Sequence, residues 1–323
     1  MTEPTTDQIR AALAPRQLGN TGLRVTPVCV GTSPLGNVPA YGYETPEDRA
    51  VATVLATLES RINFLDTAAG YGDGLSERRI GAAIRRRGGL PPGFVVATKV
   101  DAHPVTRDYS AAQVRACAEG SLERLGIDRL PLLYLHDPEV ASFDHVAARG
   151  GAIDELAKLR DEGIAGHLGL AGGPVELMRR YLDTGVFEVL LSHNRWTLLD
   201  RSADRLFDRA IEMGLAIVNA APFGGGILAT GAGGRSTYAY REASPALLDR
   251  VRRIEAICAA ASVPLAAAAL QFSMREPRVS ATVVGVSRPE RIAETERLAA
   301  WPISDEVWAE LAPLAMPPDG WIY

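Results

Sequence analysis

Eight short runs of apolar and β-branched residues recur along this 323-residue chain, and their spacing constrains the fold more than any other feature. Each run is continuous rather than alternating, which is typical of parallel strands buried on both faces. Their first residues lie about 36 positions apart on average, which suits one strand and one helix per repeat. The runs cover residues 28–31, 62–65, 94–98, 131–135, 164–170, 187–191, 215–218 and 281–286.

Amphipathic segments between the runs predict helices. The clearest is 111–125, where apolar and small residues recur on one helical face. Thr45–Asp48 and Ser287–Glu290 have the form of a capping box, and Ser244 precedes a first-turn proline. Eight strand–helix units with no linker predict a closed (β/α)8 barrel, the TIM barrel. A doubly wound open sheet is the alternative, but it usually has fewer strands and a switch point.

Two segments fall outside this repeat. Residues 1–15 carry little apolar periodicity, so we expect a loosely ordered arm before a single barrel domain over 16–323 with a C-terminal tail. Residues 223–243, after the seventh strand, are rich in glycine and tyrosine and poor in helix signal. Loops of that length are usually functional, and this one is placed to close over a ligand.

Composition excludes several classes of protein. Hydrophobic residues make up 47% of the chain, which excludes intrinsic disorder, and the net charge of −5 argues against nucleic-acid or anionic-membrane partners. Cys29, Cys117 and Cys258 are far apart and form no CxxC pair, which excludes a disulfide framework and a cysteine-built zinc site. With neither a signal-peptide pattern nor a membrane-spanning run, we expect a cytoplasmic protein that acts on small molecules.

Ionisable residues stand directly after three successive predicted strands. Asp66 follows the second run, Lys99 the third and His136 the fourth, with Tyr71 five residues beyond Asp66. Each alone has an ordinary explanation, as a turn cap, a strand-end charge or a core histidine. A barrel gathers the carboxyl ends of its strands on one face, so together they predict one pocket.

The four side chains suggest proton transfer to or from a substrate oxygen. A free tyrosine has a pKa near 10, but a nearby ammonium favours the phenolate, and a carboxylate would hold that ammonium in place. Histidine can orient the same oxygen. Such a phenol gives a proton to a carbonyl or takes one from a hydroxyl. Because none of the four is a good nucleophile, the missing partner is expected to be a hydride carrier.

Five motifs between about Arg16 and Ala300 resemble the aldo-keto reductase superfamily: RQLGNTGLRVTPVCVGT, INFLDTAAGYGDGLSERRIG, VVATKV, LLYLHD and VVGVSRPERIAET. The TSPLGN and GYGDGLSERRIG segments resemble its bacterial branch of D-threo-aldose, L-fucose and L-galactose 1-dehydrogenases with pyridoxal 4-dehydrogenase. The resemblance implies a TIM barrel, an extended nicotinamide cofactor without a Rossmann domain, and a catalytic tetrad. Tyr71 would be the general acid/base, Lys99 its pKa tuner, Asp66 the partner of the lysine, and His136 the group that orients the carbonyl.

The resemblance also implies cofactor contacts. Ser192 and Asn194 are candidates to hold the carboxamide, with His193 as a further one. Ala220 occupies the position of a stacking aromatic, so stacking falls to Phe223 or is absent. The phosphates are expected at the backbone of residues 223–228, which include Gly224, Gly226 and Leu228, and at the helix start after Ser287.

The choice between NAD and NADP stays open, with a slight preference for NAD. Gly285 stands where members that prefer NADP often carry lysine, which weakens the case for a bound 2′-phosphate. Arg291 keeps a position that often meets that phosphate, and Arg288 is near it. Thr295 replaces the asparagine of the family.

Two further patterns are rejected. Gly224, Gly226 and Ala229 match the dinucleotide fingerprint, but no helix is expected at once after this seventh strand. The acids and histidines between His136 and His145 lack a ligand spacing, so no metal is expected. Substrate contacts are expected from Leu35, Tyr41, Trp196 and Trp321, with Pro34, Tyr43 and Tyr323 beside them.

The first functional hypothesis is NAD(P)-dependent oxidation of an aldose at C1 to its lactone. The alternative is reduction of an aldehyde or ketone, including an intermediate of natural-product biosynthesis. A third hypothesis, from a different class, is a catalytically silent, cofactor-binding regulatory subunit, against which the intact tetrad argues. A homo-oligomer is compatible with the sequence.

Overall fold

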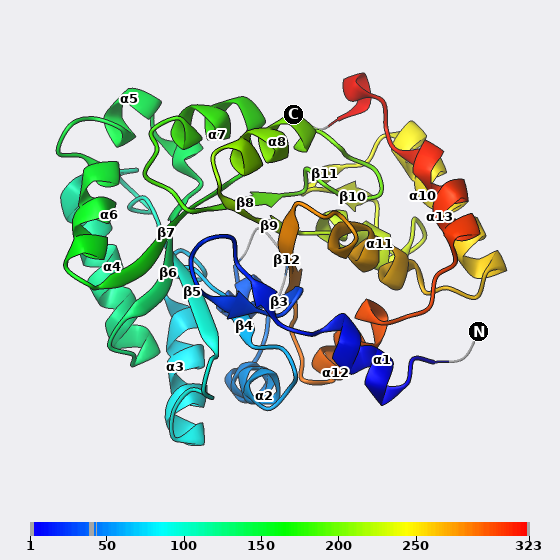
Figure 1. The fold of residues 1–323 in the computed structure, drawn as a ribbon, viewed down its shortest axis with the longest axis horizontal. Helices are drawn as coiled ribbons and strands as arrows, with labels where there is room; N and C mark the ends of the chain where they lie inside the picture. The colour runs from blue at the N-terminus through cyan, green and yellow to red at the C-terminus, as the bar shows by residue number, and fades with distance from the viewer. Residues whose placement is uncertain (1–2, 39–41, 43, 322–323) are drawn as a thin grey trace.

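The computed structural model describes residues 3–38, 42 and 44–321, and eight parallel strands in it close into a barrel (Figure 1). Around the ring the strands follow chain order, and the last of them pairs with both the first and the seventh. They are β3 (Val28–Gly31), β4 (Phe64–Asp66), β5 (Val95–Val100), β6 (Leu130–His136), β7 (Ala165–Gly172), β8 (Val189–His193), β9 (Ala216–Ala220) and β12 (Val279–Gly285). The predicted (β/α)8 barrel is confirmed, and each predicted run overlaps one strand.

Helices surround the barrel (Figure 1). The longer ones are α2 (Glu47–Leu58), α3 (Leu75–Arg87), α4 (Ala111–Leu125), α6 (Ala152–Asp161), α7 (Val175–Leu182), α8 (Asp204–Glu212), α10 (Pro245–Ala260), α11 (Leu265–Met274), α12 (Glu290–Ala299) and α13 (Asp305–Leu311). Single turns of helix lie at α5 (Phe143–Val146) and α9 (Ile227–Thr230). Within the described residues no single helix is long and apolar enough to cross a membrane, and α10 with α11 meets that test only as a pair bent by 101°.

The barrel interior is a packed core. A hairpin of β1 (Arg16–Gln17) and β2 (Arg24–Val25) brings Leu18 and Val25 into the same buried cluster as inward-facing strand residues such as Phe64 and Leu132. Gly19 in its turn lies against the backbone and side chain of Ala216, the first residue of β9. The hairpin therefore covers the amino-terminal end of the barrel and leaves the carboxyl ends of the strands for a site.

The described part of the arm expected at residues 1–15 contains a helix. Residues Thr6–Ala12 form helix α1, which contacts α12. Thr5 accepts from the Gln8 amide and the Gln8 side chain accepts from the Thr5 amide, a complete capping box. Leu13 then buries its side chain. The capping box stabilises the first turn of this short helix, and the buried Leu13 after it, rather than a long apolar stripe, attaches the segment to the barrel.

Two of the three predicted helix starts differ from the expectation. Ser244 does cap α10, where its side chain accepts from the Leu247 amide at 3.2 Å. At α2 and α12, however, the cap residues are Pro46 and Pro289, and neither helix has a side-chain cap hydrogen bond. The Thr45 hydroxyl donates instead to the carbonyl of Pro34 at 3.0 Å. It therefore anchors the loop after β3 rather than the helix.

The segment after β9 is more structured than predicted. A turn at η4 (Gly224–Gly226) leads directly into α9, and β10 (Thr237–Tyr238) pairs with β11 (Arg241–Glu242) in a small hairpin. Gly224 has a φ of +57° and lies against the ring of Tyr238, so a side chain at this position would collide with it. A helix thus follows the glycines at once, contrary to the expectation, although it is only four residues long.

Candidate active site

A cavity of about 370 Å³ lies at the carboxyl ends of the strands, and the four predicted residues Asp66, Tyr71, Lys99 and His136 all line it. Its wall also includes Pro34 from the turn after β3 and Val283 and Gly285 from β12. Further lining comes from the ends of β8 and β9 and from the segments after β6 and β9, among them Asp137, Glu139, His193, Phe223 and Tyr240. The four predicted side chains that meet here are up to 70 positions apart in the sequence, from Asp66 to His136.

Lys99 and Asp66 form an ion pair that is almost fully buried. Nζ of Lys99 lies 2.5 Å from Oδ1 of Asp66 and donates a second hydrogen bond to the carbonyl of Thr67 at 2.7 Å. Burial raises the pKa of the Asp66 carboxyl, and the positive charge of Lys99 opposes that shift. The neighbouring strands β4 and β5 hold both backbones, so the ammonium has a fixed position at the base of the cavity.

Tyr71 reaches the same ammonium from the loop between β4 and α3. Its hydroxyl lies 3.3 Å from Nζ of Lys99, and Nζ is 4.8 Å from the centre of the ring. The loop packs closely on the turn after β3. Gly72 has a φ of +66°, and a Cβ there would lie 1.8 Å from the carbonyl oxygen of Gly36. The tight turn at Gly72 therefore sets where the phenol points.

The pKa of the Tyr71 phenol lies well above its ordinary value. Burial is the largest cause, and the carboxylates of Asp66, Asp137 and Asp101 add to it. Nζ of Lys99 lies 3.3 Å from the phenol, where its positive charge opposes this rise, although Asp66 is its nearer partner at 2.5 Å. The role of Lys99 in lowering the pKa of Tyr71 stays a prediction.

His136 lies between two carboxylates at the end of β6. Its Nδ1 is 2.6 Å from Oδ1 of Asp101, and its Nε2 is 3.7 Å from Oδ2 of Asp137. Its ring meets the ring of Tyr71 edge-on, with centroids 5.8 Å apart and an interplanar angle of 83°. Burial by itself would lower the pKa of His136, but Asp137 and Asp101 more than offset it, so the pKa is raised.

The carboxamide candidates have the orphaned polar atoms that such a ligand needs. Ser192 and Asn194 are buried at the end of β8, on either side of the cavity-lining His193. Within the described residues, Oγ of Ser192 and Oδ1 of Asn194 have no hydrogen-bond partner. Buried polar atoms are nearly always paired in folded proteins. These two therefore fit a ligand amide, which offers both a donor and an acceptor.

The other predicted cofactor residues divide into two groups. Phe223, Gly226 and Gly285 line the cavity, whereas Gly224 packs against Tyr238 and Leu228 is buried in the core. The predicted residues around the start of α12 lie beyond Gly285. Ser287 is partly exposed, Arg288 is exposed and Thr295 is buried. Arg291 forms an ion pair with Glu294 at 2.8 Å.

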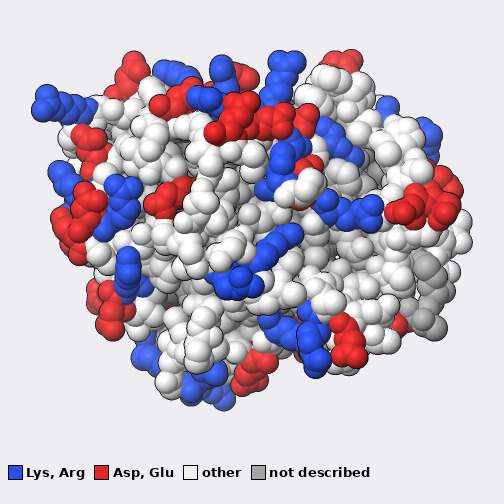
Figure 2. All heavy atoms as spheres, viewed as in Figure 1, with Lys and Arg blue, Asp and Glu red and all other residues white. Residues whose placement is uncertain are grey.

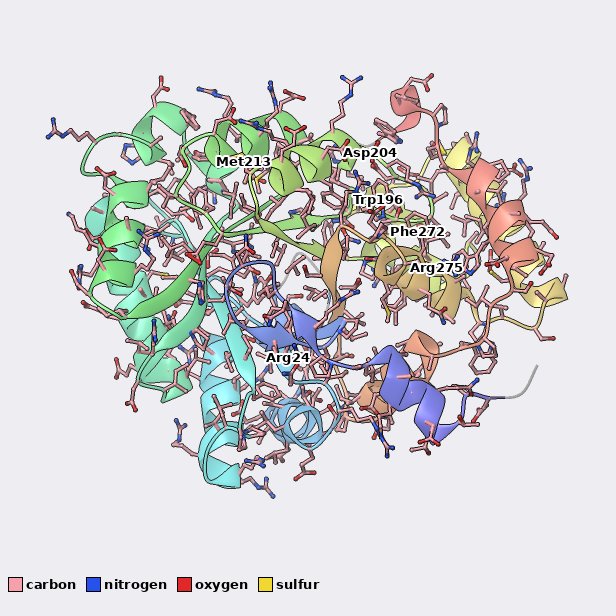
Figure 3. The ribbon with its side chains drawn as sticks, in the orientation of Figure 1. Arg24, Trp196, Asp204, Met213, Phe272 and Arg275 are labelled. Atoms are coloured by element: carbon pink, nitrogen blue, oxygen red, sulfur yellow. The ribbon has the colours of Figure 1, made fainter. Side chains whose placement is uncertain are left out.

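Of the predicted substrate contacts, Pro34 lines the cavity, whereas Leu35, Trp196 and Trp321 are not among its lining residues. Leu35 is fully buried in the core beside the lining Pro34, and Tyr41, Tyr43 and Tyr323 lie outside the described residues. Trp321 donates its indole N–H to the carbonyl of Met316 at 3.1 Å. Trp196 packs against Phe207 and Phe272, and borders a different cavity with Arg275 (Figure 3). The chain after β8 carries this indole away from the tetrad.

Sequence reasoning missed several polar residues of the site. Asp137 and Glu139 line the cavity, and Asp101 contacts His136 from the segment after β5. The sequence pattern suggests Asp137 only as a member of a possible metal cluster. In the described part of the chain, no group of three or more His, Cys, Asp or Glu could hold a metal. The available signal was position, since both aspartates directly follow the end of a strand.

A model of the Aldo/keto reductase family matches residues 27–315. Three characterised relatives align over most of the chain. L-galactose dehydrogenase from Arabidopsis thaliana is 33% identical over 86% of this chain and 86% of its own length. D-threo-aldose 1-dehydrogenase from a Pseudomonas species is 33% identical over 85% and 93%. Pyridoxal 4-dehydrogenase from Microbacterium luteolum is 32% identical over 92% and 96%.

Solved structures with the same fold include two family members. An aldo-keto reductase from Bacillus halodurans in its holo form superimposes with a TM-score of 0.77 at 24% identity, covering 96% of this chain and 98% of that one. A glycerol dehydrogenase from Gluconobacter oxydans gives a TM-score of 0.75 at 22% identity over 94% and 95%. At these identities the likeness establishes the fold.

Proposed function

Because the chain belongs to the aldo/keto reductase family and is an NAD(P)-dependent oxidoreductase, we propose that it oxidises an aldose at C1 to the corresponding lactone. The observation that carries the proposal is the phenol of Tyr71, held 3.3 Å from the buried Lys99–Asp66 pair in one cavity with His136. Asp137, Glu139 and His193 make the same cavity polar, as a hydroxylated substrate requires. The names of two relatives, an aldose and a galactose dehydrogenase, point to the same substrate class.

Residues of the cavity and residues beside it, among them Ser192 and Asn194, which do not line it, would hold the cofactor. Ser192 and Asn194 would bind its carboxamide, and the backbone near Gly226 together with the start of α12 would bind its phosphates. When bound, the nicotinamide accepts or supplies the hydride at its C4 carbon. We also propose NAD rather than NADP, because Gly285 offers no charge to a 2′-phosphate and Arg291 is already paired with Glu294.

The residues of the chain then handle the proton. In the oxidative direction Tyr71 must first have lost its own proton; the C1 carbon then loses its hydrogen with both bonding electrons, and the proton of the C1 hydroxyl passes to the phenolate oxygen of Tyr71. The carbonyl of the lactone forms between the same carbon and oxygen. In the reductive direction Tyr71 returns the proton to the carbonyl oxygen. His136 orients the substrate oxygen, and Lys99 stabilises the phenolate.

A matched set of absorbance assays tests the proposal. One panel supplies NAD⁺ or NADP⁺ with L-fucose, D-arabinose, L-galactose or pyridoxal. The other supplies NADH or NADPH with simple aldehydes and diketones. Growth of the reduced-nicotinamide absorbance with a sugar is the expected result, and it also identifies the cofactor. Signal in the second panel alone would overturn sugar oxidation, and binding of cofactor without any turnover would favour a regulatory subunit.

Replacing Tyr71 with phenylalanine tests the chemical role directly. Tyr71→Phe removes the transferable proton and leaves the packing of the ring, so we expect kcat to fall about 100- to 10,000-fold while the Kd for cofactor stays near the wild-type value. Steady-state kinetics and fluorescence titration with reduced cofactor measure the two quantities. Near-normal turnover in this variant would rule out Tyr71 as the proton carrier.

Carbonyl reduction is the second candidate function, and the raised pKa of Tyr71 favours it. A protonated phenol is ready to donate to a carbonyl oxygen, whereas oxidation requires that Tyr71 first lose its proton. The substrate would then be an aldehyde or ketone, including a natural-product intermediate. The two panels separate this candidate from sugar oxidation by comparing the rates in each direction.

We further propose that the protein acts in the cytoplasm on small molecules without nucleic-acid or membrane partners, alone or as a homo-oligomer. Basic and acidic side chains are interspersed on the face shown in Figure 2, in keeping with a net charge of −5. Nucleic-acid and anionic-lipid surfaces are usually met by concentrated positive charge. Retention on a heparin column at 150 mM salt, an ordinary physiological ionic strength, would contradict this proposal.

A further inference from the structure

Asp101 connects two parts of the site that come from different strands. It lies just after β5, where Oδ1 is 2.6 Å from Nδ1 of His136 and Oδ2 accepts from the backbone N–H of Gly70 at 2.7 Å. Gly70 directly precedes Tyr71. A Cβ on Gly70 would lie 2.7 Å from Oδ1 of Asp101, so the carboxylate fits tightly against the tyrosine loop. One carboxylate therefore positions both the tyrosine loop and the histidine ring.

This contact decides which nitrogen of His136 carries a proton. An ionised carboxylate only accepts hydrogen bonds, so Nδ1 must be the donor, and the tautomer with a lone pair on Nδ1 would face a negative charge. Nε2 lies 3.7 Å from Oδ2 of Asp137, beyond hydrogen-bond distance, so it is the ring nitrogen left for a ligand in the cavity. In the imidazolium form Nε2 bears a hydrogen and donates. In the neutral form Nε2 bears a lone pair and accepts.

We propose that Asp101 is a positioning residue that fixes Nδ1 of His136 as a proton donor, so that Nε2 meets the substrate oxygen as a donor in the charged form and as an acceptor in the neutral form. This inference rests on the proposed oxidoreductase function. The imidazolium suits carbonyl reduction, because a donor stabilises the oxygen as it gains negative charge. The neutral ring suits oxidation, because an acceptor orients the hydroxyl of the substrate.

The groups around His136 set the pH at which it changes between the charged and the neutral form. Asp101 after β5 and Asp137 after β6 favour the imidazolium and raise its pKa, whereas burial and the Lys99 ammonium oppose it. Around them the cavity is lined by Tyr71, Asp66, Glu139, His193 and Tyr240. With the pKa raised, the donor form persists to higher pH than in a histidine of ordinary pKa. Reduction is therefore expected to slow, and oxidation to speed up, as pH rises through the folded-state pKa.

Asp101→Asn reverses the tautomer for a geometric reason. The N–H of Gly70 still needs an acceptor, so the amide oxygen of the asparagine turns toward Gly70 and its NH₂ group turns toward Nδ1 of His136. Nδ1 then becomes an acceptor, and neutral His136 carries its hydrogen on Nε2. The loss of the carboxylate charge also lowers the pKa of His136.

Long-range ¹H–¹⁵N NMR of the histidine rings measures the tautomer without any need for turnover. In wild-type protein above the His136 pKa we expect the Nδ1–H tautomer, and in Asp101→Asn the Nε2–H tautomer. His136→Gln assigns the signal among the five histidines. An Nε2–H tautomer in wild-type protein would overturn the proposal without recourse to any variant. The Nδ1–H tautomer persisting in Asp101→Asn would overturn it too.

Kinetics supply the functional test. In Asp101→Asn we expect oxidation at high pH to fall about 10- to 100-fold, the loss of one charge-assisted hydrogen bond, while reduction loses its dependence on the His136 titration. Asp108→Asn is the matched control, because Asp108 caps the segment before α4 through Ser110 and should keep both pH profiles. Equal losses in both directions with unchanged pH profiles would contradict the proposal. Absence of wild-type turnover would count against the proposed function and leave the NMR result to decide this inference.

Discussion

Lys99 illustrates how strongly single residues of this site depend on their partners. Its side chain is 1% exposed and that of Asp66 is 5% exposed, so neither charge is solvated by water. Thr67 supplies a carbonyl to the ammonium, but Oδ2 of Asp66 has no hydrogen-bond partner among the described residues. Pairs of this kind contribute little net stability, yet losing one partner leaves an uncompensated buried charge. The pair is therefore best understood as the means of placing a charge beside Tyr71.

Lys99→Met should destabilise the protein by about 3–5 kcal/mol, because it leaves the Asp66 carboxylate buried without its partner. The double variant Asp66→Asn/Lys99→Met should recover part of that loss, since no charge remains buried. Urea denaturation of the wild type, both single variants and the double variant gives the coupling energy. Additive losses would show that the two residues do not act as a pair.

The residue scale also shows where sequence reasoning succeeds. The positions of Asp66, Lys99 and His136 follow from counting to the end of an apolar run, because a parallel barrel gathers strand ends on one face. The pKa of Tyr71 does not follow from such counting. It is raised mainly by burial, and the carboxylates of Asp66, Asp137 and Asp101 add to the rise, an arrangement that only the folded structure sets.

At the scale of elements, helix starts depend on which neighbour a hydroxyl finds. Ser244, Ser110 and Thr5 accept from the amides of their own helices. Thr45 has a suitable position in sequence, but it lies close enough to the carbonyl of Pro34 to donate there instead. Local motifs therefore indicate where a helix begins more reliably than they indicate how its first turn is bonded.

Ser244→Ala should lower the free energy of unfolding by about 1 kcal/mol, because it leaves the Leu247 amide without its acceptor. Ser287→Ala provides the comparison, since α12 has no side-chain cap hydrogen bond. In cofactor-free protein the free energy of unfolding of Ser287→Ala should lie within about 0.5 kcal/mol of the wild-type value. Thermal and urea unfolding of the two variants side by side test this, and equal effects would mean that the cap at Ser244 contributes nothing.

At the scale of the whole molecule, the interior of the barrel is filled with packed side chains. Side chains from several strands meet in one cluster, sealed at one end by the β1–β2 hairpin. Tyr134 on β6 is fully buried there, against the missing side chain of Gly169 on β7. These packed side chains support the strand ends that carry the tetrad. They confine the cavity to the carboxyl ends of the strands, where loops from separate strands surround it.

Gly169→Ala should destabilise the protein by about 1–3 kcal/mol, because the new Cβ would lie 2.2 Å from a ring carbon of Tyr134. Tyr134→Leu in the same chain should relieve the clash, so the double variant should be less destabilised than the two single effects combined. Unfolding free energies of the four proteins measure this. A wild-type stability for Gly169→Ala would show that β6 and β7 pack less closely than the structure has them.

The sequence by itself determined the barrel, the order of its strands and the four residues at their ends, because apolar periodicity and strand spacing are local properties of a chain. Tertiary structure decided the rest. The bond between Asp101 and His136, the protonated state of Tyr71 and the removal of Trp196 from the cavity all depend on distances between side chains on different elements. Electrostatic and packing energies change steeply over an ångström, and no spacing along the chain specifies distances that finely.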